Sequence, residues 1–125
     1  MDNSIVEHKH IIRIGLEDCH YTGNTVAGAR LCQYAIDCVS MLGCAREGMA
    51  GMLANINANC RSEVHALDEL EITARFESCG NTSRKYSFKI VKTIEYATDG
   101  AKTAVLLDEP RLVMDGTAVL VRKPH

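Results

Sequence analysis

A long segment of small and apolar residues near the start of the chain constrains the fold more than any other feature. After the turn and capping residues Gly23, Asn24 and Thr25, the pattern predicts a helix that starts near Thr25 or Val26 and ends around Gly43 to Gly51. A helix that is apolar on nearly all sides must be covered by other parts of the protein. Its first face carries Leu31, Ala35, Cys38 and Leu42, and most of the remaining circumference carries Val26, Ala29, Cys32, Ile36 and Val39.

Alternation of apolar and polar residues with a period of two predicts strands in the rest of the chain. It runs over residues 6–16, 70–77, 86–91 and 112–121, and a weaker candidate strand covers residues 51–59. Turn residues at 79–81 and 98–100 separate the strands, three glycines between residues 43 and 51 end the helix, and Gly116 suggests a bend in the last strand. We therefore expect a single α+β domain over residues 1–125, with a curved, mostly antiparallel sheet wrapped around one long helix.

The predicted sheet is too small to cover the whole helix. With 125 residues, the chain supplies no other element that would cover the flank left open. We therefore expect a dimer at least, with an active site built from two chains.

Composition and charge exclude several classes of function. The net charge is −2 and the basic residues are scattered, which does not favour binding to nucleic acid or to an acidic membrane. No apolar run is long enough to span a membrane, and the first ten residues do not have the pattern of a signal peptide. The six cysteines contain no CxxC pair. Their even count would allow disulfides, but without a secretory signal we interpret them as reduced thiols of a cytoplasmic protein.

The candidate site lies in the turn before the helix. Titratable side chains, including Asp18, His20 and Tyr21, precede a helix start with free backbone N–H groups. Such an arrangement suits a reaction that develops negative charge. His8 and His10 share a predicted strand face and, together with His20, would supply three nitrogen ligands, but without a carboxylate ligand we expect no metal site.

The block Asp18–Arg30, DCHYTGNTVAGAR, resembles the helix entrance of the CoA ammonia-lyases, which reads DCHYTGN or DAHYTGN followed by VxGAR. It also resembles, more distantly, the DCDPAG-type turn of hotdog acyl-CoA thioesterases, with His20 in the place of their catalytic aspartate. Two further blocks agree with the lyases, Gly80–Lys85 and the stretch from Glu109-Pro110 to Gly116-Thr117. The resemblance implies a hotdog fold and a lyase of amino-acid fermentation that eliminates ammonia from a β-aminoacyl-CoA, such as 3-aminobutyryl-CoA.

This chemistry assigns roles to the residues of the entrance block. Removal of ammonia needs a base for the α-proton and stabilisation of the thioester enolate. We expect His20 to be the general acid/base, and the backbone N–H groups of Gly23 and Asn24 to hold the enolate oxygen. Asp18 would share a face with His20 if the segment is extended, and would then orient the imidazole or hold a substrate ammonium; Tyr21 would supply a hydroxyl.

The resemblance also implies which residues bind the CoA part of the substrate. A basic pair at the position of Arg84 and Lys85 commonly meets the phosphates of CoA in hotdog proteins, and we expect that role here. CoA is then part of the substrate, no separate cofactor is expected, and the assembly is a homodimer or a trimer of dimers. For Arg30 we expect a structural role, in a pair with Asp37 or with a strand.

The chain departs from the family pattern at two places. Met41 stands where the family usually has a helix glutamate, and Ser62-Glu63-Val64 and Leu67-Asp68 replace an Ala-Pro-Val stretch and a Gly-Asp turn. Three functions remain open at this point: the lyase, a hotdog acyl-CoA thioesterase in which His20 or Asp18 activates water, and a non-catalytic acyl-CoA-binding subunit. The sequence after the turn favours the lyase, and Met41 supports the third.

Overall fold

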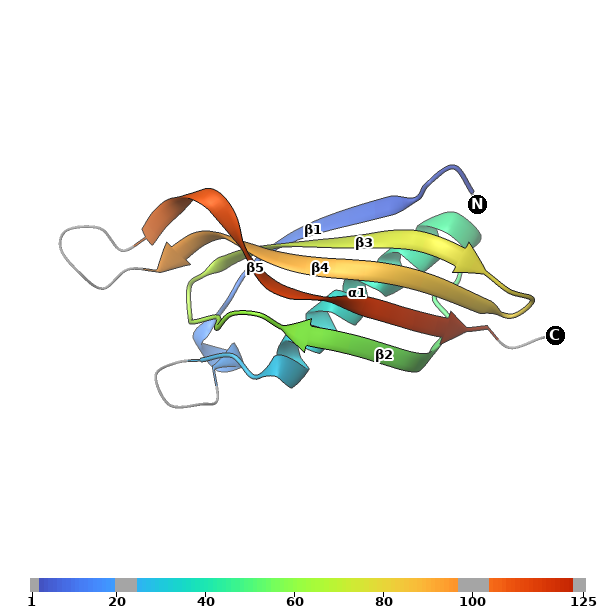
Figure 1. Cartoon of the computed structure of the whole chain (residues 1–125), viewed down its shortest axis with the longest axis horizontal. Coiled ribbons are helices and arrows are strands. Elements are labelled where there is room, and N and C mark those ends of the chain that lie inside the picture. The colour runs from blue at the N-terminus through green and yellow to red at the C-terminus, as the bar shows by residue number, and fades with distance from the viewer. Residues whose placement is uncertain (1–2, 20–24, 97–103, 123–125) are drawn as a thin grey trace.

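The computed structural model describes residues 3–19, 25–96 and 104–122. Its strands are β1 (Glu7–Arg13), β2 (Met52–Cys60), β3 (Glu69–Cys79), β4 (Ser83–Tyr96) and β5 (Ala104–Val121), and its helix is α1 (Gly28–Glu47). A short 3-10 turn, η1 (Leu16–Asp18), follows β1. The strands form one antiparallel sheet in the order β1-β3-β4-β5-β2, and α1 runs across one face of it (Figure 1). The predicted α+β architecture is confirmed.

Helix α1 begins two to three residues later than predicted. Val26 donates its N–H to the carbonyl of Val64 at 2.9 Å, and Thr25 forms a β-bridge with His65, so this segment is extended rather than helical. The helix ends at Glu47 because Gly48 adopts the left-handed conformation, with φ of 76°, and its N–H bonds to the carbonyl of Cys44. The predicted end in the glycine-rich region is confirmed.

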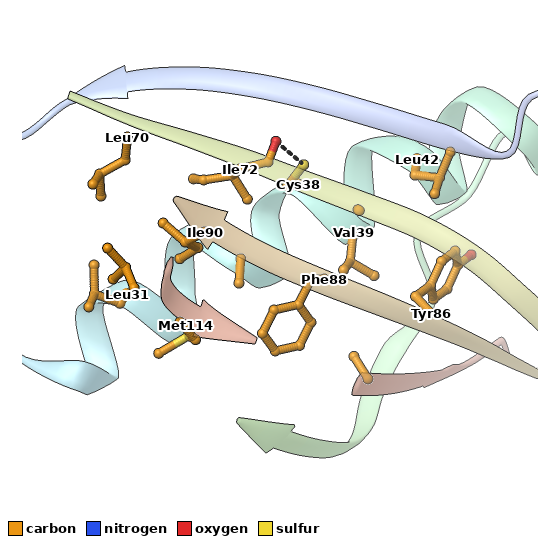
Figure 2. Close-up of a cluster of buried hydrophobic side chains, with 14 of the residues drawn as sticks. Leu31, Cys38, Val39, Leu42, Leu70, Ile72, Tyr86, Phe88, Ile90 and Met114 are labelled. Atoms are coloured by element: carbon orange, nitrogen blue, oxygen red, sulfur yellow. Dashed lines mark hydrogen bonds between the residues drawn. The ribbon is translucent and has the colours of Figure 1, made fainter. Parts of the chain in front are cut away.

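The core lies between α1 and the inner faces of β3, β4 and β5. The predicted helix face is buried, and apolar residues of the strands point toward it (Figure 2). The opposite side of the helix is more open than its composition suggests, since Met41 is 45% exposed. The largest apolar side chains of this cluster that are fully buried are Ile14, Leu42, Leu70, Ile72, Ile90, Met114 and Leu120.

Strands β2 and β5 differ most from their predictions. The weakly predicted strand exists as β2, an edge strand that pairs only with β5 among the described strands. Strand β5 begins at Ala104, well before the predicted start at Leu112. A bend was expected at Gly116, but the pairing of β5 with both neighbouring strands is regular at this residue. The register of β5 against β4 shifts at two other places, between Leu106 and Arg111 and between Leu112 and Met114. The expected turn at residues 98–100 lies outside the described residues.

All six cysteines are free thiols in the structure. Cys44, Cys60 and Cys79 are exposed, whereas Cys38 is buried in the core. No helix in the described part of the chain is long and apolar enough to cross a membrane.

Candidate active site

Asp18 ends the 3-10 turn and bonds to the first turns of α1. Its Oδ1 accepts a hydrogen bond from Arg30 Nε at 2.8 Å, and its Oδ2 accepts one from the Tyr34 hydroxyl at 2.8 Å. The guanidinium of Arg30 also lies over the ring of Tyr34, at 4.7 Å from its centroid. The carboxylate is buried, and the three side chains form a closed cluster that fixes the segment before the candidate catalytic turn to the helix.

The cluster keeps Asp18 ionised. Burial alone raises the pKa of this carboxyl, but the hydrogen bonds from Tyr34 and Arg30, together with the charge of Arg30, bring the pKa below its ordinary value. Burial and the neighbouring Asp18 carboxylate raise the pKa of the Tyr34 phenol, which therefore remains a donor at neutral pH. These bonds occupy the Asp18 carboxylate within the chain. Asp18 is the last residue of the 3-10 turn, and whether it shares a face with His20 stays a prediction, since His20 lies outside the described residues.

Most of the predicted turn falls outside the described residues. His20, Tyr21, Gly23 and Asn24 belong to it, so their predicted roles stay predictions. The described residues on both sides are nevertheless fixed. Asp18 holds the N-terminal side to α1, and Thr25 holds the C-terminal side through its bridge to His65.

The connection from β2 to β3, residues 61–68, borders this site. Its central part pairs with the segment that opens α1, through the bonds at Thr25 and Val26. Its end pairs with Ile14, whose N–H donates to the Asp68 carbonyl and whose own carbonyl accepts from Leu67. The connection is therefore bound on both sides of η1 and the candidate catalytic turn.

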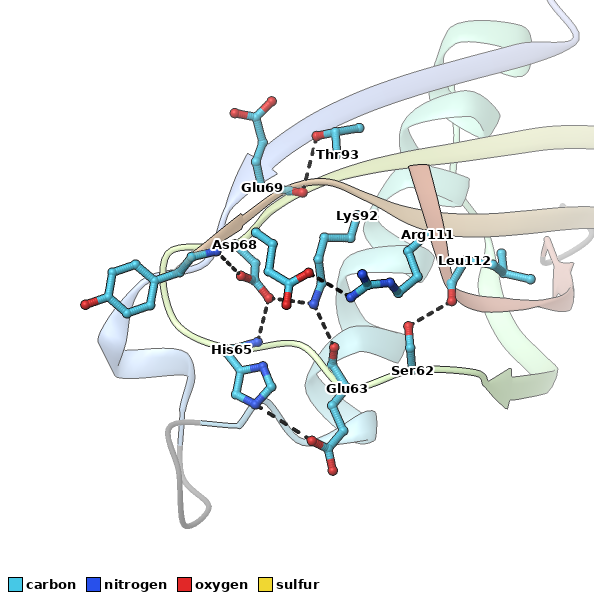
Figure 3. A network of polar contacts seen from close by, with 11 residues as sticks. Ser62, Glu63, His65, Asp68, Glu69, Lys92, Thr93, Arg111 and Leu112 are labelled. Carbon is cyan, nitrogen blue, oxygen red and sulfur yellow. Dashed lines mark hydrogen bonds and ion pairs between the residues drawn. The ribbon is translucent and has the colours of Figure 1, made fainter. Parts of the chain in front are cut away.

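A buried ion pair anchors this connection. Lys92 Nζ lies 3.0 Å from Asp68 Oδ2, and both side chains are at most 1% exposed (Figure 3). Lys92 also donates to the carbonyl of Glu63 at 3.0 Å. The Asp68 carboxylate accepts the backbone N–H groups of His65 and Tyr96, at 2.8 and 2.9 Å. Every charge of the pair is thus satisfied by hydrogen bonds, as burial requires.

The predicted phosphate-binding residues lie at the opposite end of the helix. Arg84 is buried and pairs with Glu47, the last residue of α1, at 2.9 Å, whereas Lys85 is exposed. Arg30 and Glu47 are 17 positions apart in the helix, which corresponds to about 25 Å along its axis. One chain therefore does not bring Asp18 and Arg84 together, and their separation is a reason to consider a second chain.

Several residues of the site were missed or misjudged from sequence. Arg30 has the expected structural role, but it bonds to Asp18 and to Gln33 rather than to Asp37 or a strand. Tyr34, Lys92 and His65 gave no local signal, because their partners are distant in sequence. In the described residues, no group of three or more His, Cys, Asp or Glu side chains is placed to hold a metal ion.

The single long helix wrapped by a five-stranded antiparallel sheet defines a hotdog-fold protein. The β-alanyl-CoA:ammonia lyase from Clostridium propionicum has the same fold, with a TM-score of 0.86 at 24% identity over 100% of this chain and 93% of that one. A hexameric acyl-CoA thioesterase matches with a TM-score of 0.78 at 14% identity, over 100% of this chain and 74% of that one. No protein-family model matches the sequence.

Sequence comparison places the chain more narrowly. It is 33% identical over 113 residues to the 3-aminobutyryl-CoA ammonia lyase of Acetoanaerobium sticklandii, which covers 87% of this chain and 90% of the relative. The chain therefore belongs to the family of the 3-aminobutyryl-CoA ammonia lyases, which are carbon–nitrogen lyases.

Proposed function

We propose that this protein eliminates ammonia from a β-aminoacyl-CoA, such as 3-aminobutyryl-CoA, to give an enoyl-CoA. The single observation that carries this proposal is the 33% identity to a 3-aminobutyryl-CoA ammonia lyase over 87% of the chain. The lyase motif at residues 18–30 lies within this domain, at the entrance to its only described α-helix. CoA enters as part of the substrate.

In this mechanism, His20 takes the α-proton and the electron pair of the C–H bond passes into the thioester enolate. The backbone N–H groups of Gly23 and Asn24 stabilise the enolate oxygen, and Tyr21 supplies a hydroxyl. The substrate amine is protonated, so when the C–N bond breaks the nitrogen leaves as neutral ammonia with the electron pair of that bond. The bonds of Asp18 to Arg30 and Tyr34 support a positioning role for Asp18, because its carboxylate already has strong partners.

The complete site requires two chains in this proposal. Arg84 and Lys85 would bind the phosphates of CoA in the site of a neighbouring copy, since they lie about 25 Å along the helix from the Asp18 end of their own chain. Arg84 would keep Glu47 as a partner, and the exposed Lys85 ammonium would be accessible to the phosphates. The assembly is then a homodimer or a trimer of dimers acting in the cytoplasm.

The test uses the reverse reaction. Purified protein is mixed with crotonyl-CoA and ammonium, and loss of the enoyl-thioester absorbance is followed together with release of free thiol. Absorbance loss that needs ammonium and releases no thiol is the expected result. Thiol release would instead assign a thioesterase, and CoA binding without either signal would assign a non-catalytic subunit.

The role of His20 is tested separately. His20→Ala should lower turnover by about 100-fold or more, the usual contribution of a general acid/base. Full turnover in this variant would reject the assignment while leaving the lyase activity in place. His10→Ala, a substitution of a half-buried histidine on β1, is the matched control and should keep wild-type turnover.

A further inference from the structure

Two cysteines from different elements meet near the start of the helix. Cys32 lies in the second turn of α1, and Cys60 is the last residue of β2. The end of β2 lies beside the first turn of α1 (Figure 1), where a Cβ atom built on Gly28 would be only 3.2 Å from the Sγ atom of Cys60. The absence of a side chain at Gly28 therefore leaves the space that the Cys60 thiol uses.

The pairing of β2 directs the Cys60 side chain toward the helix. Cys60 is the register partner of Met114 on β5, and the side chains of paired residues lie on the same face of a sheet. Met114 is fully buried in the core that α1 covers. Alternate residues of a strand share a face, and Ala58, two residues before Cys60, packs against the same core. The Cys60 thiol therefore lies on the helix side of the sheet.

Helix geometry directs Cys32 toward the same place. Residues four positions apart lie one above the other on a helix, with Cβ atoms about 5–6 Å apart, so Cys32 and Gly28 share a face. Helical side chains lean toward the N-terminus of the helix, which brings the Cys32 thiol over the turn that contains Gly28. The Cys60 thiol lies against this same turn.

The two thiols differ in their exposure to solvent. Cys60 is exposed, whereas Cys32 is half-buried and packs against the core. Burial, with the neighbouring Cys60 as a second cause, raises the pKa of the Cys32 thiol. A dissolved oxidant therefore meets Cys60 first, while Cys32 stays a protonated thiol beside it.

We propose that Cys60 and Cys32 form a reversible oxidation site, in which hydrogen peroxide oxidises Cys60 and Cys32 then closes a disulfide. The Cys60 sulfur attacks the peroxide, the O–O bond breaks, and a sulfenic acid and one water are formed. The Cys32 sulfur then attacks the Cys60 sulfur, the S–O bond breaks, and a second water leaves with the remaining thiol proton. Two thiols lose two electrons in total, and one peroxide is reduced to two waters. This proposal does not depend on the lyase function.

The disulfide protects Cys60 from irreversible damage. A sulfenic acid without a nearby thiol is oxidised further, to sulfinic and sulfonic acids that thiol reductants do not reverse. Condensation with Cys32 stops the oxidation at a stage that a thiol reductant does reverse. The bond also closes a loop of about 30 residues and joins the end of β2 to α1.

Peptide mapping tests the proposed bond. Reduced protein is treated with hydrogen peroxide, its remaining thiols are blocked with N-ethylmaleimide, and it is digested with trypsin without reduction. Cleavage after arginine places Cys32 and Cys60 in separate peptides, residues 31–46 and 47–61. The expected product is these two peptides joined within one chain. Fragmentation locates the bond at Cys32, since its peptide contains two other cysteines.

Substitutions assign the two roles. Cys32→Ser and Cys60→Ser should each lose the joined peptides. The matched control is Cys44→Ser, an exposed cysteine about 18 Å farther along the same helix, and it should keep them. In Cys32→Ser, sulfinic and sulfonic acids at Cys60 should accumulate several-fold faster than in wild type. Cys32→Ala repeats the test with a different side chain, and circular dichroism checks that each variant is folded.

Thermal unfolding gives an independent readout. Closing the loop should raise the melting midpoint of oxidised wild-type protein by about 10 °C, and dithiothreitol should reverse the rise. Peroxide should produce no such rise in Cys60→Ser.

Three results would overturn the proposal. The first is a bond that joins Cys60 to another copy of the chain, seen as a dimer on a denaturing gel without reductant. The second is sulfinic acid at Cys60 that forms as fast in wild type as in folded Cys32→Ser. The third is wild-type protein in which peroxide produces no bond between Cys32 and Cys60.

Discussion

Leu67 is the one described non-glycine residue with a positive φ, at 72°. Replacing it by glycine should relieve about 1–2 kcal/mol of left-handed strain, partly offset by about 0.5–1 kcal/mol of extra chain entropy in the unfolded state. We therefore expect Leu67→Gly to be more stable than Leu67→Ala by about 0.5–1 kcal/mol, seen as a higher denaturant midpoint.

The control for this prediction is Leu67→Ala. Alanine keeps the strained backbone and removes the half-buried side chain, so it should be no more stable than wild type. Equal stabilities of the glycine and alanine variants would show that the backbone at this residue is not strained.

The lowered pKa of Asp18 should make the folding stability of the protein depend on pH. Its folded-state pKa lies below the ordinary value of 3.8, so its contribution is complete above about pH 4 and is lost as the pH falls through the lower folded value. Asp18→Asn should cost about 1.5–3 kcal/mol at pH 7, the usual worth of hydrogen bonds to a charged group, and the difference from wild type should shrink below pH 4. Thermal unfolding from pH 7 to pH 3 measures this, and a difference that grows toward acid pH would contradict it.

The sequence identified the residues of the site only in part. Asp18 was found because it belongs to a recognisable motif, but its partners Arg30 and Tyr34 lie 12 and 16 residues away. Arg30 has an acidic neighbour on the helix in Asp37, which suggested a local pair. The fold decides between such partners, since it buries Asp18 against the first helical turns and leaves Asp37 exposed.

At the scale of elements, periodicity was a reliable guide where burial is one-sided. Strands β3 and β4 alternate between buried and half-buried or exposed residues along most of their length, and both were predicted. Strand β2 is largely exposed on both faces, so alternation is weak and so was its prediction. The connection from β2 to β3 has no periodic signal, because a lysine and an aspartate 24 residues apart hold it.

The buried pair gives a prediction for this connection. Lys92→Met should cost about 3–5 kcal/mol, because it leaves the Asp68 charge buried without its partner. Adding Asp68→Asn in the same chain removes that charge and keeps a carbonyl acceptor for one backbone N–H. The double variant should therefore be more stable than Lys92→Met alone. Urea unfolding measures both, and additive losses would show that the two side chains are not coupled.

The cysteine thiols should differ in reactivity according to how deeply each is buried in its helix or strand. Burial raises the pKa of Cys38, on the inner face of α1, to about 11. Exposed Cys44, Cys60 and Cys79 should react first with a thiol reagent at pH 8, and Cys38 only after unfolding. Mass spectrometry of partially labelled native protein tests this order. Early labelling of Cys38 would mean that α1 separates from the sheet in the native state.

The exposed apolar residues make a prediction about the whole molecule. Met52 and Leu53 on the β2 edge are 62% and 42% exposed, and Met41 on α1 is 45% exposed. If a second copy covers this edge, Leu53→Glu should shift sedimentation toward monomer and reduce lyase activity in parallel. Ile11→Glu on the opposite edge strand β1, which is 62% exposed, should leave the dimer intact. A stable wild-type monomer would contradict the two-chain site.

The Lys92–Asp68 pair also bears on how such a sequence changes through time. Loss of either partner alone leaves an uncompensated charge in a site that is at most 1% exposed. A lineage that replaces one therefore passes through a poorly folded intermediate unless the other changes at nearly the same time. The two positions should be inherited as a unit, with relatives carrying both charges or neither, and the backbone of the β2–β3 connection should differ between the two groups.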